Sequence, residues 1–169
     1  MNGNDVPLSE FYLSPGHIYL SQQPTLVSTV LGSCVAVSLW YSKKGYGGMA
    51  QFLYPFTGDR NRATPQYGNV ALKCLLAMFR ETGAPEKHLQ AQIFGGALVA
   101  PAECMRIAKE NVQMAIKMLG RYRIGIVSED TGGKMGRKIV YNTQTNEAIV
   151  YKVNTLRQAD WYPYAHEGR

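Results

Sequence analysis

Apolar residues along this 169-residue chain fall into short strand-like runs and two longer helical stripes. Runs rich in Val and aromatic residues predict strands over residues 17–20, 25–31, 34–40, 46–54, 89–94, 122–127, 137–141 and 148–153. Helical spacing predicts one helix over 69–82 with Asn69 as its N-cap, and a second from Pro101 to Gly120. Because strands dominate both ends of the chain, the pattern favours an α+β fold, a mixed β-sandwich with two main helices, over a doubly wound α/β sheet.

Length and composition indicate one compact domain with an ordinary apolar fraction of 46%. No apolar stretch approaches the ~18 residues needed to cross a bilayer. The first residues are polar and acidic, unlike a secretory signal. We therefore expect a cytoplasmic protein without membrane insertion. The three cysteines are 40 and 30 residues apart, a spacing that suits free thiols and offers neither a disulfide framework nor a metal site.

The chain carries 18 Lys+Arg against 12 Asp+Glu, a formal charge of +6, and all its cations follow residue 40. A moderate positive field suits an acidic partner. No run of like charges is longer than Lys43–Lys44, so no nucleic-acid-binding arm is indicated. Arg60 and Arg62 lie in the most loop-like region, 56–66, and could contact acidic helices or form an ordinary exposed loop.

The most informative segment for chemistry is Gly32-Ser33-Cys34, a cysteine at the start of a predicted strand. Glycine allows close backbone approach, and neighbouring N–H groups could stabilise an oxyanion. The alternative is a core cysteine, since free Cys is among the most buried residue types. A second candidate is the acid pair Glu129-Asp130, for which solvation or a structural bond to Arg137 is the better interpretation. The Gly-Gly pairs at 95–96 and 132–133 lack the spacing of phosphate-binding loops and predict turns.

The segment Leu-Gly-Ser-Cys-Val-Ala-Val at 31–37 resembles the chemoreceptor glutamine deamidase family, CheD. Further landmarks follow in the family's order: Gly-Gly-Met at 47–49, Tyr-Gly-Asn at 67–69, Phe-Gly-Gly-Ala at 94–97, Glu-Asn-Val at 110–112, Glu-Asp-Thr-Gly-Gly at 129–133 and Gly-Arg-Lys-Ile at 136–139. The resemblance spans about residues 10–153. It implies a single CheD-like domain over 1–153 and a C-terminal extension over 154–169, where Trp161, Tyr162 and Tyr164 suggest docking on the body or on a partner.

This resemblance implies a β-sandwich flanked by helices, related to bacterial toxin deamidases. It implies an enzyme that converts glutamine side chains of chemoreceptor cytoplasmic helices to glutamate through a Cys–His–Thr triad and a thioester, without a cofactor. The methyl-accepting chemoreceptors are then the partners, together with a CheC-like phosphatase where one is present. No nucleic acid is expected.

Carried over residue by residue, the nucleophile falls on Cys34 and the hydroxyl partner on Ser28, with Thr29 beside it. Gly32 and Ser33 would serve the substrate or its oxyanion. The histidine position, seventeen residues after the cysteine, holds Gln51. A glutamine amide has no basic site near neutral pH, so it cannot take the thiol proton. The sequence therefore predicts a family member whose deamidase activity is weakened or lost while receptor or CheC binding is retained.

Two alternatives remain open. The protein could be a fully active deamidase with another base, for which the chain offers only His17, His88 and His166. It could instead be a non-enzymatic module that binds anions or nucleic acid, a reading supported only by the net charge.

Overall fold

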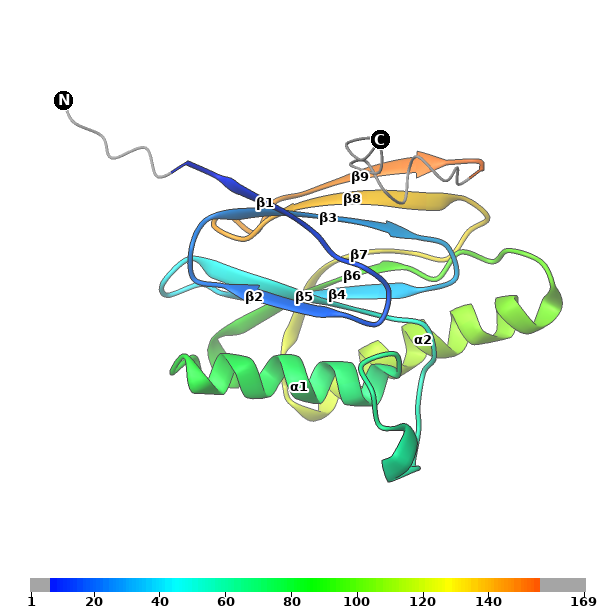
Figure 1. Ribbon diagram of the computed structural model, residues 1–169, viewed down its shortest axis with the longest axis horizontal. Coiled ribbons are helices and arrows are strands. Elements are labelled where there is room, and N and C mark those ends of the chain that lie inside the picture. Colours follow the sequence, from blue (N-terminus) through cyan, green and yellow to red (C-terminus); the bar gives the residue numbers. More distant parts are fainter. Residues whose placement is uncertain (1–6, 156–169) are drawn as a thin grey trace, which may run out of the picture.

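A computed structural model describes residues 7–155, in which two β-sheets stack face to face and helices cover one of them (Figure 1). The four-stranded sheet has the order β1 (Ser9–Tyr12), β3 (Thr25–Leu31), β8 (Gly136–Asn142), β9 (Ala148–Val153). The five-stranded sheet has the order β2 (Ile18–Ser21), β5 (Tyr46–Phe52), β4 (Val35–Tyr41), β6 (Leu89–Gly95), β7 (Gly125–Thr131). The predicted α+β sandwich is confirmed.

Both sheets are mixed. The β1–β3 and β6–β7 pairs are parallel and the other neighbours antiparallel. The helices α1 (Gly68–Glu81) and α2 (Ala102–Arg121) pack against the five-stranded sheet (Figure 1). Two short 3₁₀ helices, η1 (Arg60–Arg62) and η2 (Glu86–His88), lie in the connections. Because β3 belongs to one sheet and β4 to the other, the turn that joins them crosses between the sheets.

Two apolar cores follow from the alternation of side chains along the strands. Val35, Val37 and Leu39 of β4 face the helices and join their apolar stripes in the larger core. Ala36, on the opposite face of β4, belongs to a second core between the sheets, whose other buried members are Leu13, Val27, Leu31, Met49, Phe94, Ile139 and Tyr141. Cys34 packs against this second core, so the candidate chemistry lies at one end of the space between the sheets.

The start of α1 differs from the sequence prediction. The N-cap is Tyr67 rather than Asn69, and its side chain makes no capping bond. Asn69 instead forms a two-bond pair with the backbone of Thr57: its Oδ1 accepts from the Thr57 N–H at 3.1 Å and its Nδ2 donates to the Thr57 carbonyl at 2.9 Å. The residue type suited a cap, but the preceding loop recruits its side chain.

The strand predicted over 122–127 begins later and extends further, as β7 from Gly125 to Thr131. The helix α2 runs one residue past the predicted end at Gly120, and Arg123 then adopts a positive φ of 56°. The Ile124 N–H bonds back to the Leu119 carbonyl at 3.0 Å. Residues 122–124, predicted to begin the strand, therefore form the turn that ends α2.

Strand β1 was not among the predicted strands. It is a four-residue edge strand, and its parallel pairing with β3 is a tertiary contact that local pattern does not encode. The Phe11 ring of β1 stacks on the Tyr19 ring of β2 with centroids 3.9 Å apart, which joins the two sheets along their shared edge. The chain passes from β1 to β2 through a turn at Pro15-Gly16, where Gly16 has a φ of +76°.

None of the helices within residues 7–155 is long and apolar enough to span a membrane. The predicted C-terminal extension falls almost entirely outside the described residues, and Trp161, Tyr162 and Tyr164 lie there.

Candidate active site

The backbone of Cys34 is held by the turn that follows β6. The Gly96 N–H donates to the Cys34 carbonyl at 2.9 Å, and the Ala97 N–H donates to the Gly32 carbonyl at 2.9 Å. Gly95 has a φ of +104°, and a Cβ placed there would lie 2.3 Å from the Cys34 carbonyl oxygen. The Gly-Gly pair is therefore a tight turn, as predicted, and its close approach to the cysteine requires glycine.

A buried amide from α2 fixes the rest of the cysteine turn. Asn111 is fully buried, and its Nδ2 donates to the Ser33 carbonyl at 3.2 Å and to the Leu53 carbonyl at 2.9 Å. Its Oδ1 is buried without a hydrogen-bond partner in the described part of the chain. In the sequence, Asn111 stands out only as part of the Glu-Asn-Val landmark at 110–112. The available signal was a polar residue on the apolar stripe of α2, three residues after Ala108 and four before Ala115.

Gln51 lies inside the sandwich. It is fully buried in β5 and pairs in register with Ala36, two residues after Cys34 on the neighbouring strand. Both ends of its amide are bonded to β3 in the opposite sheet. Its Nε2 donates to the Val30 carbonyl at 3.0 Å, and its Oε1 accepts from the Thr29 hydroxyl at 2.7 Å. Gln51 therefore links the two sheets.

Thr29 is fully buried and faces the interior of the sandwich. Its Oγ1 lies 2.7 Å from the Oε1 of Gln51 and 2.8 Å from the Leu13 carbonyl oxygen. A hydroxyl group has one proton to donate, so it serves one of these two acceptors at a time. The structure thus brings Thr29 to Gln51 and makes the two residues a polar pair inside an apolar core.

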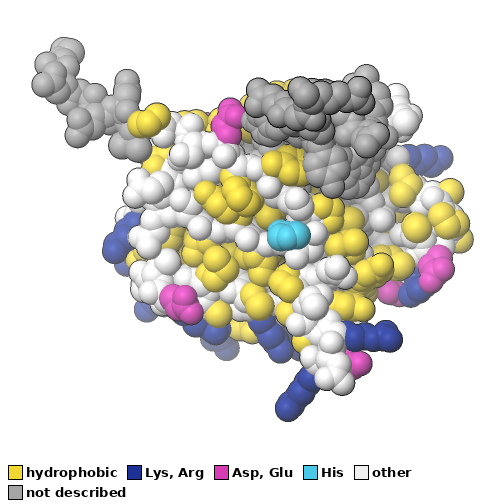
Figure 2. Space-filling view, viewed as in Figure 1, with side chains coloured by type: hydrophobic (Ala, Val, Ile, Leu, Met, Phe, Trp, Pro, Cys, Tyr) yellow, Lys and Arg dark blue, Asp and Glu magenta, His cyan; other side chains and the backbone are white. Residues whose placement is uncertain are grey.

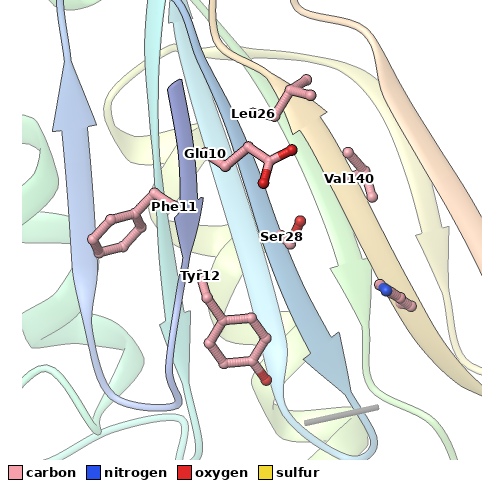
Figure 3. A pocket seen from close by; sticks show the side chains of 7 residues that line it. Glu10, Phe11, Tyr12, Leu26, Ser28 and Val140 are labelled. Atoms are coloured by element: carbon pink, nitrogen blue, oxygen red, sulfur yellow. The ribbon is translucent and has the colours of Figure 1, made fainter. Parts of the chain in front are cut away.

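Ser28 has the opposite orientation, because successive side chains along a strand point to opposite faces. It lines a pocket of about 220 Å³ on the outer face of the four-stranded sheet, together with Glu10, Tyr12 and Lys138. Figure 3 shows the Ser28 side chain on this face, with Glu10 and Val140 nearby. The structure therefore does not bring Ser28 to Gln51.

The thiol of Cys34 is strongly disfavoured as a thiolate. Burial raises its pKa to about 11, and the residue's own backbone N–H only partly offsets this effect. The thiolate of Cys34 is therefore disfavoured at neutral pH. A reactive cysteine normally has a cation nearby that lowers its pKa, and neither Thr29 nor Gln51 carries a charge.

Two of the three histidines, His17 and His88, lie within the described residues. His88 lies at the start of β6, the end opposite to the one where Gly95 pairs with Val35. His17 is exposed, and its Nδ1 is 3.0 Å from the Pro15 carbonyl oxygen. Its backbone is close to Gln51, since the Gln51 N–H donates to the His17 carbonyl at 3.1 Å. His166 lies outside the described residues.

The acid pair has a structural partner, as predicted. Arg137 is 2% exposed, and its Nε donates to the Asp130 carboxylate at 2.9 Å while its Nη2 donates to the Gly132 carbonyl at 2.7 Å. Glu129 accepts from the Thr131 hydroxyl at 2.7 Å. The bonds of Arg137 link β8 to β7 and to the turn after it, whereas the Glu129–Thr131 bond lies within β7. Nowhere in residues 7–155 do three His, Cys, Asp or Glu side chains gather in a way that could hold a metal ion.

Comparison of this sequence with known proteins shows which family it belongs to. The family model "CheD chemotactic sensory transduction" matches residues 55–152. The chain is 38% identical over 146 residues to a probable chemoreceptor glutamine deamidase CheD of Trichlorobacter lovleyi, covering 85% of this chain and 91% of that protein. It is 33% identical over 146 residues to the chemoreceptor glutamine deamidase CheD of Thermotoga maritima, covering 86% and 93% of the two chains. The chain belongs to the CheD family.

The resemblance stated from sequence is thus confirmed for most of the chain. A third CheD protein, a probable chemoreceptor glutamine deamidase of Sulfurimonas denitrificans, is 33% identical over 142 residues, 82% of this chain and 91% of its own. The region matched by the family model begins after Gln51. The match to the family model therefore carries no information about the residue at position 51.

Proposed function

We propose that this CheD-family protein recognises the cytoplasmic helices of methyl-accepting chemoreceptors and that its glutamine deamidase activity is strongly weakened. The observation that supports the loss of activity is the bonding of Gln51, whose amide is used at both ends by Thr29 and Val30. The position where the family resemblance implies a base holds a side chain that can neither accept nor deliver a proton.

Deamidation through a cysteine needs two proton transfers. The thiol must lose its proton as the sulfur attacks the side-chain carbonyl carbon of the substrate glutamine, and the departing amide nitrogen must gain a proton to leave as ammonia. Water then hydrolyses the thioester and releases a glutamate. With Gln51 in place, Cys34 lacks an acceptor for its proton, and burial keeps the pKa of that thiol at about 11.

The expected loss of rate is large. Removal of a general base typically costs ~10²–10⁴ in rate, and the members of a catalytic triad acting as a unit can cost ~10⁶. Thr29, rather than Ser28, occupies the place of the hydroxyl partner in this proposal, since its Oγ1 is the one that reaches position 51. The turn at Gly32-Ser33 would supply N–H groups to the substrate carbonyl.

In this proposal the protein still binds its protein partners, because that binding uses exposed side chains and not the buried Gln51. The cysteine turn remains ordered by Asn111 and the turn after β6, so a receptor helix can still be presented to it. We extend the proposal to a CheC-like phosphatase as a second protein partner, on the strength of the family resemblance. No cofactor is required.

The test is incubation of the protein with a purified chemoreceptor cytoplasmic fragment encoded in the same genome. We expect a measurable dissociation constant for the complex. We also expect ammonia release and amide-to-acid mass change no faster than with Cys34→Ala. Turnover that is brisk and abolished by Cys34→Ala would contradict the proposed loss of activity.

One observation favours a second candidate, an active deamidase with a displaced base. His17 is the backbone neighbour of Gln51 across the β2–β5 edge, and its Nδ1 faces the Pro15 carbonyl. A proton on Nδ1 leaves Nε2 free to act as a base. If this candidate holds, the wild-type protein releases ammonia and His17→Gln abolishes the release. If the first proposal holds, His17→Gln changes nothing measurable.

A further inference from the structure

We propose that residues 54–67, here called the 54–67 loop, form a rigid docking surface for an acidic amphipathic helix of the partner, with Phe56 as its apolar anchor. This inference rests on the proposed function, since it names the surface through which a receptor helix reaches the cysteine turn. Figure 1 shows the loop projecting from the body below the helices, with η1 near its tip.

The base of the loop is closed by backbone bonds. The N–H groups of Leu53 and Tyr54 both donate to the Gln66 carbonyl, at 2.9 and 3.0 Å, and the Gly68 N–H donates to the Tyr54 carbonyl at 2.8 Å. The rings of Tyr54 and Tyr67 contact each other with centroids 5.4 Å apart. A surface held in this way loses little conformational entropy when a partner binds.

The upper part of the loop is also fixed. Asn69 of α1 bonds both the N–H and the carbonyl of Thr57, as one strand would bond another. The Asp59 carboxylate caps η1 by accepting from the Asn61 N–H at 2.9 Å. These bonds hold the backbone of the loop in one conformation. Its exposed side chains therefore form a defined surface.

The exposed side chains combine an aromatic anchor with cations. Phe56 is 58% exposed, the highest value among the large apolar side chains of residues 7–155, and Tyr54 is 40% exposed. Arg60 and Arg62 are exposed on η1, and the sole acid on the loop, Asp59, already caps η1 and lies 3.9 Å from the Arg62 guanidinium. Figure 2 shows Lys and Arg side chains reaching outward from the lower protrusion.

A groove of about 340 Å³ lies between the loop and α1. Arg60, Asn69 and Lys73 line it, along with Thr57, Gly58, Asp59, Ala63, Val70 and Cys74. The cations Arg60 and Lys73 on its two walls favour an acidic occupant, and the exposed Phe56 of the same loop favours one with an apolar stripe. An amphipathic helix with carboxylates beside apolar residues meets both conditions. A nucleic acid is a poorer candidate, because the loop has no run of consecutive cations to contact phosphates and it exposes the large apolar side chain of Phe56.

The position of the loop links docking to the cysteine. The carbonyl of Leu53, the residue before the loop, and the Ser33 carbonyl, next to Cys34, accept from the same Nδ2 of Asn111 at 2.9 and 3.2 Å. The residue at which the 54–67 loop leaves β5 and the cysteine turn are therefore held by one buried amide.

The experiment measures the dissociation constant of the full chain for a purified chemoreceptor cytoplasmic fragment at low and high salt. We expect Phe56→Ala to weaken binding about tenfold or more, as truncation of an aromatic anchor does. We expect Arg60→Glu with Arg62→Glu to weaken it by a similar factor and to reduce its salt dependence. Matched controls are Ile149→Ala, another exposed apolar residue, on β9, and Arg121→Glu at the end of α2, both expected to bind as wild type.

The outcomes separate this inference from the proposed function. If the wild type binds the fragment and the loop variants bind equally well, the loop inference is wrong and the proposed function stands. If the wild type does not bind at all, both fail. Labelled duplex DNA is the third arm: a loss of DNA binding in the arginine variants with receptor binding unchanged overturns the helix as the occupant. Far-UV circular dichroism of each variant verifies that the fold is intact.

Discussion

Thr29 and Gln51 face each other across the two sheets, with the hydroxyl oxygen 2.7 Å from the amide oxygen. The bond lies in an otherwise apolar core, where a lost partner leaves a buried polar atom unsatisfied. The amide of Gln51 is completed by its bond to the Val30 carbonyl at 3.0 Å. In this chain the polar pair at the candidate site therefore ties the sheets together, and that role uses the groups that catalysis would need.

Replacement of Thr29 with Val should destabilise the protein. The change keeps the shape of the side chain but removes the donor to Gln51 and Leu13, so a buried acceptor is left without a partner. We expect a loss of about 1–3 kcal/mol in the free energy of unfolding, measured by urea denaturation. The matched control is Ser28→Ala on the outer face, expected to change stability by less than about 0.5 kcal/mol. Equal effects of the two variants would contradict the assignment of Thr29 to the interior.

Replacement of Asn111 with Leu should loosen the cysteine turn. The variant keeps the side chain close in size but leaves the Ser33 and Leu53 carbonyls without their donor. We expect a loss of about 1–3 kcal/mol in stability and faster alkylation of Cys34 by iodoacetamide under native conditions. Gln113→Leu, an exposed amide on the same helix, serves as the control. If Cys34 reacts at the wild-type rate in both variants, Asn111 does not position the turn.

The reactivity of Cys34 should depend on pH as that of a thiol with a raised pKa. In a Cys74→Ser, Cys104→Ser background, the rate of alkylation should rise about tenfold per pH unit, because only the thiolate reacts. We expect the rise to continue toward pH 11, since burial raises the pKa of this thiol to about 11 from an ordinary 9.0. A plateau at or below pH 9 would show that a neighbouring group stabilises the thiolate.

The same pKa shift predicts a direction for stability. The folded protein keeps the Cys34 proton to a higher pH than the unfolded chain does, so between about pH 9 and 11 the unfolded state binds fewer protons. Stability must then fall as pH rises through that window. The contribution of Cys34 is isolated as the difference in this slope between the double-serine background and the same protein with Cys34→Ala.

Much of the architecture was predictable from the chain because its pattern is locally consistent. The strands around β4 and β5, the final hairpin and both helices follow from apolar spacing and turn residues. Errors occurred where a tertiary contact overrides a local preference. The Asn69 side chain was recruited by Thr57 instead of capping α1, and the short strand β1 depends on its pairing with β3.

For the candidate site, the sequence supplied the candidate residues, whose catalytic roles stay predictions, but not their geometry. Motif spacing led to Cys34 and Gln51, and alternation along β3 could have shown that Ser28 and Thr29 face opposite sides. What spacing could not show is which of the two hydroxyls faces the interior, since that depends on which face of the four-stranded sheet packs against the other sheet. The role of Asn111 likewise required the contact between α2 and two carbonyls distant in sequence.

The most direct test of the account is the rate of ammonia release from a chemoreceptor cytoplasmic fragment with the wild type and with Gln51→His. An imidazole at position 51 would replace an amide with a base that can take the Cys34 proton and return it to the leaving nitrogen. We predict an acceleration of about 10²-fold or more over wild type, abolished when Cys34→Ala is added. Wild-type turnover as fast as that of Gln51→His would contradict the central claim that this glutamine disables the thiol.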